Sequence, residues 1–169
     1  MKNYLVLAAC LVLTADVAGQ QRSEKRVAAR VAEQKALSAF TRSAPFTPAG
    51  ATSHRDALVG PVVADATFMM ASRTALAGIL AQPAEHLTLE IPTADGVLEL
   101  DLVRAEIHST GFSVVAASTG AAMEQTPGVH YRGVIAGEPG TLAAISIFPD
   151  EVMGFVSDAT GNHVLGKLE

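Results

Sequence analysis

Histidine and acidic side chains are the first candidates for chemistry in this sequence, because together they hold catalytic metals. None of the histidines stands in an HExxH or HxxxH pattern, so no helical turn offers two zinc ligands. The nearest approach is His86 with Glu90, which share one face of an expected strand, and we interpret them as solvated side chains. We therefore predict no metal site. The five histidines are His54, His86, His108, His130 and His163.

Patterns for nucleophilic and acid–base catalysis are also missing from the sequence. It has no Gly-x-Ser-x-Gly elbow, and its one cysteine, Cys10, lies in a segment that we expect to be removed. Glu99 and Asp101 could present two carboxylates to a sugar, but the solvent face of an amphipathic strand explains their spacing better. Residues 137–140 lack the lysine and following helix of a phosphate loop and indicate a hairpin turn. We predict no catalytic or cofactor-binding residue and no enzyme.

Length and charge limit the functions that need considering. The chain has 169 residues, of which 49% are hydrophobic and 17% charged, and this is enough for one domain with its own core. Its net charge is −5. Because phosphate backbones and anionic lipids attract basic surfaces, this charge argues against nucleic acids and membrane surfaces as partners.

The N-terminal residues have the pattern of a secretory signal peptide. Lys2 precedes an apolar run over 4–13, and small residues precede a cleavage site that we place between Gly19 and Gln20. The run is too short for the roughly 20 residues of a membrane span. We expect export to the periplasm or the extracellular space, no membrane span, and no disulfide once residues 1–19 and their cysteine are removed.

Residues 20–60 predict a helix followed by a linker. The segment 23–40 is rich in Ala, Glu, Lys and Arg, with apolar residues at helical spacing and Ser23 as an N-cap. From 41 to 61, Pro and Gly recur among Ser and Thr, which interrupts regular structure. We therefore expect the main domain to begin at residue 61.

The remaining segment, 61–169, has a mainly β pattern. Leucines and isoleucines alternate with polar residues over 87–91 and 98–102 on both sides of an Asp95-Gly96 turn, which predicts a hairpin, and a short helix is expected over 72–81. The fold expected is an antiparallel sandwich or open barrel of six or seven short strands, preceded by an N-terminal helix and with one short internal helix. The other alternating runs are 112–116, 129–135, 142–148, 151–157 and 163–168.

The order of these β segments resembles the pro-region of secreted reprolysin-type (adamalysin-like) zinc metallopeptidases, particularly bacterial ones. In that family a strand ending in proline, a leucine-rich strand, a Phe-Val strand, a Tyr-x-Gly strand, a strand of small and apolar residues and a strand containing glycine follow one another. The resemblance covers residues 87–166 and is most specific in HYRGVIAG, AAISIF and EVMGF. It implies a non-catalytic domain that inhibits a zinc peptidase domain or helps it to fold.

The implied partner is a reprolysin-type peptidase domain, either in cis in a longer gene product or in trans. The chain has no HExxHxxGxxH motif, so we expect a fragment or a split gene. Without a cysteine the family's thiolate latency switch does not apply, which leaves steric cover, strand addition, or a carboxylate or histidine that reaches the zinc. Tyr131, Arg132 and Gly133 carry the family motif and are possible interface residues. A structural turn, with the tyrosine inward and the arginine solvated, is the simpler interpretation.

Two other functions remain open from the sequence. A stand-alone extracellular adhesion or ligand-binding module would bind a sugar or a surface and needs no peptidase. A small hydrolase would need a pocket in which a histidine converges with a carboxylate or a serine.

Overall fold

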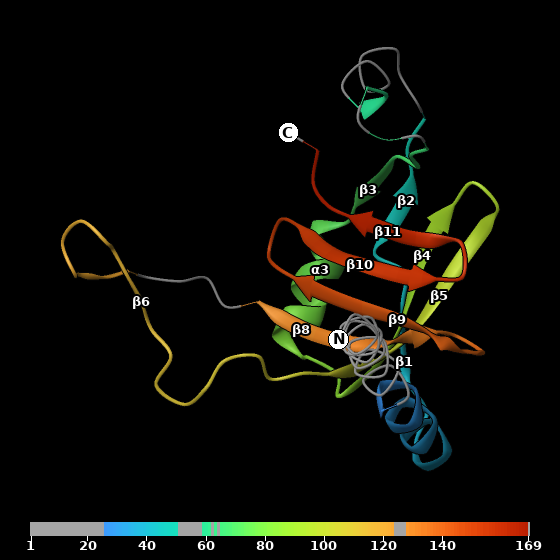
Figure 1. Ribbon diagram of the computed structural model, residues 1–169, viewed down its shortest axis with the longest axis horizontal. Coiled ribbons are helices and arrows are strands. Elements are labelled where there is room, and N and C mark those ends of the chain that lie inside the picture. The colour runs from blue at the N-terminus through green and yellow to red at the C-terminus, as the bar shows by residue number, and fades with distance from the viewer. Residues whose placement is uncertain (1–25, 51–58, 62, 64, 124–127, 169) are drawn as a thin grey trace, which may run out of the picture.

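One large sheet organises this protein, and its strands follow the alternating apolar pattern of the sequence (Figure 1). The computed structural model describes residues 26–50, 59–61, 63, 65–123 and 128–168. In chain order, the seven strands of the sheet are β1 (Thr41–Ser43), β4 (His86–Thr93), β5 (Gly96–Arg104), β8 (Val129–Ile135), β9 (Glu138–Ile147), β10 (Val152–Asp158) and β11 (Gly161–Leu165).

The strand order in the sheet is β1-β4-β5-β8-β9-β10-β11. β1 runs parallel to β4, and all the other neighbours are antiparallel. The predicted β4–β5 hairpin is confirmed, because Thr93 pairs with Gly96 across the turn and Gly96 has a φ of 135°, which a side chain would strain. In the described part of the chain β1 and β11 are the two edges. The predicted mainly β fold is therefore confirmed as an open sheet.

A helix lies on each face of this sheet. The N-terminal helix covers residues 26–37 of the described chain, inside the predicted range. On the other face, α3 (Arg73–Ala81) begins after Ser72, whose hydroxyl accepts a hydrogen bond from the amide of Ala75, as expected for an N-cap. Among the described residues, no helix is long and apolar enough to cross a membrane.

The main core lies between α3 and one face of the sheet. Every second residue of the strands contributes to it, because alternate side chains of a strand point to the same face. Leu76 of α3 is fully buried there, and the hydroxyl of Tyr131 donates a hydrogen bond to the carbonyl of Ala84 (3.1 Å). The sheet residues of this core are Leu87, Leu89, Ile91, Leu100, Leu102, Val129, Tyr131, Ile135, Ala143, Ile145, Ile147, Val152 and Val156.

The described part of the segment expected to be a linker contributes strands instead. β1 extends the sheet, with Arg42 opposite Thr88, and β2 (Phe46–Pro48) pairs with β3 (Met69–Ala71) in a two-stranded ribbon. Phe46 is buried in the main core and ties this segment to the domain. The sequence did not show these strands because three residues are too few to display an alternating pattern.

A second small hairpin interrupts the chain between β5 and β8. It consists of β6 (Val114–Val115) and β7 (Ala122–Met123), so only two residues of the run predicted over 112–116 are strand. Figure 1 shows β6 far from the main sheet. The hairpin therefore adds nothing to the core.

Candidate functional site

The face of the sheet that carries the N-terminal helix is the candidate functional surface, and we call it the helix-side face. Beneath the helix Val103 is 6% exposed, whereas Phe155 is 39% and Val164 is 86% exposed. We call β4, β5 and β8 the covered half of this face, and β9, β10 and β11 the open half. One row of paired residues crosses both halves and consists of His86, Val103, Arg132, Ala144, Phe155 and Val164.

Apolar contacts hold the N-terminal helix on the covered half. Ala28 and Val31 lie about one turn apart on the helix, and they pack against Val103 of β5 and Val134 of β8. All four side chains are buried. The helix is therefore docked on the domain and takes part in its second, smaller core.

A partly buried ion pair fixes the end of the same helix. Asp101 of β5 is 2% exposed, accepts a hydrogen bond from the hydroxyl of Thr88 (2.9 Å), and pairs with the ammonium group of Lys35. The expectation that Asp101 faces solvent is wrong, because the helix covers the polar side of the strand. A carboxylate removed from water needs such partners, so the burial of Asp101 is explained by helix docking.

The other acidic residues of the covered half lie at its β1 edge. Glu90 and Glu99 are opposite each other, and Arg42 bridges them, with its Nη2 2.7 Å from Glu90 and also in contact with Glu99. Hydrogen bonds to Glu99 and then to Glu90 raise the pKa of Arg42. His86 stacks on Phe40 instead, with 5.1 Å between the ring centroids. His86 and Glu90 therefore have different partners.

The open half exposes apolar side chains. Met153 (49% exposed) and Phe155 line a shallow hollow of about 330 Å³ that also includes Ala144 and Ser146. Exposed apolar side chains that cluster in this way are typical of a contact surface. Beside them, no other described strand pairs with the outer edge of β11, so its main-chain groups are free for strand addition.

His130 of β8 lies at the border of the two halves. Its Nδ1 is 2.9 Å from the hydroxyl of Ser146, and its Nε2 is buried with no hydrogen-bond partner in the described chain. The rings of His108 and Phe148 pack edge-on against it, with centroids 5.7 and 6.0 Å away. Burial, followed by repulsion from His108, lowers the pKa of His130, and Glu106 acts in the opposite direction. The imidazole is therefore neutral at neutral pH.

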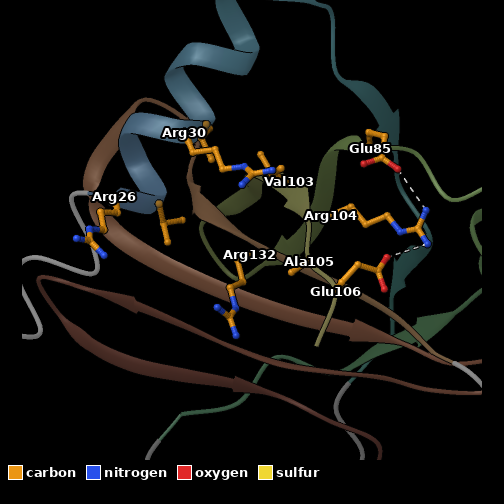
Figure 2. Close-up of a pocket in the computed structure, with 10 residues that line it drawn as sticks. Arg26, Arg30, Glu85, Val103, Arg104, Ala105, Glu106 and Arg132 are labelled. Atoms are coloured by element: carbon orange, nitrogen blue, oxygen red, sulfur yellow. Dashed lines mark hydrogen bonds and ion pairs between the residues drawn. The ribbon is translucent and has the colours of Figure 1, made fainter. Parts of the chain in front are cut away.

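Arginine side chains surround a groove of about 530 Å³ next to the N-terminal helix, which we call the arginine groove (Figure 2). Arg26 and Arg30 come from the helix, Arg132 from β8, and Arg104 from the end of β5. Ion pairs with two glutamates of the groove, each at 3.2 Å, neutralise Arg104. The remaining lining residues are Val27, Val31, Glu85, Val103, Ala105 and Glu106.

The motif residues Tyr131, Arg132 and Gly133 lie inside β8 rather than in a turn. Tyr131 is 1% exposed, and burial raises its pKa, whereas Arg132 is exposed. These two side-chain directions are as predicted. A Cβ at Gly133 would lie 1.9 Å from the carbonyl oxygen of Asp101, so the close approach of β5 and β8 requires glycine. Of the three residues, Arg132 reaches the helix-side face.

The remaining predictions concern the signal cleavage site and metal binding. The cleavage residues Gly19 and Gln20 lie outside the described residues. Among the residues that are described, no group of three or more His, Cys, Asp or Glu side chains could hold a metal ion.

Sequence reasoning missed the arginine groove. The i, i+4 spacing of Arg26 and Arg30 was an available signal, because it places them on one side of a helix. Nothing local in the sequence joins them to Arg132, which the sheet brings beside the helix. Comparisons of the chain with protein-family models, with curated proteins and with solved structures find no match.

Proposed function

We propose that this chain is an exported, non-catalytic pro-region-like domain that inhibits or helps to fold a reprolysin-type zinc peptidase domain. It would dock on that partner through the open half of the helix-side face. The observation that carries the proposal is the exposure of Met153, Phe155 and Val164 beside the unpaired edge of β11. The order of the β segments over residues 87–166 supports the choice of partner.

Two properties of the open half support inhibition by contact rather than by a metal-binding side chain. A partner that covers the exposed apolar side chains gains free energy in proportion to the apolar area removed from water. An extended segment of the partner can also add to β11 as a further strand. In contrast, His163 of β11 already has Asp158 within 3.2 Å. Steric cover and strand addition are therefore the two mechanisms we favour.

The position of β11 also suits a partner in cis. β11 is the edge strand, and the described chain leaves the sheet after Leu165. A peptidase domain joined beyond this point would be tethered beside the exposed apolar side chains. A short tether raises the effective concentration of such a partner, so a weak interface would be sufficient for latency.

The test begins with the genome that encodes this chain, which we expect to encode a protein with an HExxHxxGxxH motif in frame with the gene or elsewhere. That catalytic domain is purified, and its cleavage of a fluorogenic peptide is measured with and without the exported chain. We expect inhibition, and we expect Met153→Asp to weaken it by about tenfold, because a charge would be buried in the interface. Met70→Asp is the matched control, since Met70 is 58% exposed on β3, outside the helix-side face.

Two results would contradict the proposal. One is a genome without any HExxHxxGxxH protein, and the other is a peptidase whose activity and refolding yield the chain does not change. If the chain instead binds a glycan or a cell surface, and Met153→Asp abolishes that binding, the adhesion or ligand-binding alternative replaces the pro-region function.

A further inference from the structure

The arginine groove contains cations that the protein does not neutralise. In the described part of the chain, Arg26, Arg30 and Arg132 have no ion pair, and all three line this groove. Three of the four described cations outside the groove are matched with acids: Lys35 with Asp101, Arg42 with Glu90 and Glu99, and Lys167 with Asp150. The fourth, Arg73 of α3, has no ion pair among the described residues and stands alone rather than in a group of arginines.

This grouping runs against the charge of the whole chain. The chain has a net charge of −5, so its acidic side chains outnumber its basic ones and are available in excess as ion-pair partners for arginines. Four arginines and two glutamates nevertheless line the groove, and both glutamates are bound to Arg104. Arg26 and Arg30 also repel each other at their i, i+4 spacing on the helix. A ligand that supplies negative charge would relieve this repulsion.

The shape of the groove indicates an extended ligand rather than a small anion. Figure 2 shows the guanidinium groups of Arg26, Arg30 and Arg132 well apart, so they do not converge on one point as they would around a phosphate. Val27, which is only partly buried, adds an apolar side chain to the groove lining. Carboxylates spaced along a peptide, with apolar side chains between them, match this arrangement, because arginine binds carboxylates in pairs of hydrogen bonds.

We propose that the arginine groove binds an acidic segment of a partner protein, with the carboxylates of Asp and Glu side chains on Arg26, Arg30 and Arg132. Arg132 also lines the hollow of the open half, so the groove and the hollow are adjacent. The acidic segment would therefore lie beside the surface covered by the rest of the partner. This inference goes beyond the proposed function, because it holds whether or not the partner is a peptidase.

The experiment measures the fluorescence anisotropy of a labelled peptide of alternating leucine and glutamate in the presence of the full exported chain. We expect saturable binding that weakens as salt is added and that is absent for the glutamine counterpart of the peptide. Arg30→Gln and Arg132→Gln should each weaken binding by about fivefold, since each removes one exposed ion pair. Both side chains are exposed, so thermal denaturation should show an unchanged fold.

Two controls keep the test specific. Arg73→Gln removes an exposed arginine of α3, outside the groove, and should leave the affinity unchanged. The Arg132→Glu variant should no longer bind the glutamate peptide, and it should bind a peptide of alternating leucine and lysine more tightly than the unsubstituted chain does. Met153→Asp, which tests the proposed function, should leave peptide binding intact, so the two proposals can fail separately.

Three outcomes would overturn the inference. In the first, the glutamine peptide binds as tightly as the glutamate peptide. In the second, Arg73→Gln weakens binding as much as Arg30→Gln. In the third outcome, inorganic phosphate or duplex DNA displaces the peptide with the same dependence on Arg30 and Arg132, which would make the groove a general anion site.

Discussion

The covered and open halves of the helix-side face differ in which side chains they bury: polar residues are buried in the covered half, and apolar residues are exposed in the open half. The covered half carries the polar residues Thr88 and Asp101, yet the protein's own helix buries them. The open half carries Met153, Phe155 and Val164, and these apolar side chains are exposed. A folded chain normally covers its apolar surface first. The difference teaches that the helix completes the covered half of the domain, whereas no described element of the chain covers the apolar side chains of the open half.

The largest effect is expected where β5 and β8 meet beneath the covered half. Gly133→Ala places a Cβ against the backbone of Asp101 and should force the two strands apart, at a cost of about 3 kcal/mol. For a chain of this length that corresponds to a drop in Tm of roughly 6–12 °C. Gly140→Ala is the control, because a Cβ there meets nothing within 4 Å. Equal Tm values for the two variants would mean that β5 and β8 are not so closely packed.

A smaller effect is expected for the ion pair that fixes the N-terminal helix. Lys35→Met leaves the buried carboxylate of Asp101 with the Thr88 hydroxyl as its remaining partner, which should lower the free energy of unfolding by about 1–3 kcal/mol in urea denaturation. Adding Asp101→Asn should recover part of the loss, because a neutral amide does not need the ammonium group. If Lys35→Met alone leaves stability unchanged, the helix is held by its apolar contacts.

The border between the halves should respond to pH through His130. The pKa of His130 is lowered in the folded protein. Near pH 6.5 the imidazole therefore binds a proton in the unfolded chain but stays neutral in the folded protein. The stabilisation is complete above about pH 6.5 and is lost as the pH falls through the lowered pKa. His130→Asn, which can still bond to Ser146, should flatten this part of the stability profile. Identical profiles for the two proteins would show that this pH dependence does not arise from His130.

The smallest effect on stability is expected on the open half. Met153→Asp places a charge on a half-exposed position and should change the free energy of unfolding by less than about 0.5 kcal/mol. The same experiment on Val134→Asp, which lies beneath the helix, provides the contrast. A Tm for Met153→Asp that falls as far as that of Val134→Asp would show that the open half is part of the core and not a docking surface.

Sequence patterns predicted the elements whose information is local. The β4–β5 hairpin follows from alternation around Asp95-Gly96, and α3 follows from the cap at Ser72. The burial of Asp101 does not follow in this way, because alternation assigns a residue to a face and does not say what covers that face. The same limit applies to Arg132, whose place beside Arg26 and Arg30 depends on the docking of a distant helix.

The sequence separation of the paired strands predicts that the two halves form at different stages of folding. β9, β10 and β11 are consecutive and joined by hairpins, so their contacts close short loops at little cost in entropy. The covered half instead needs β5 to pair with β8 across an intervening hairpin, and β1, which borders this half, pairs with β4 from a distant segment. We therefore expect the open half to form early, and the N-terminal helix to be the last part to become ordered and the first to be released when the domain unfolds.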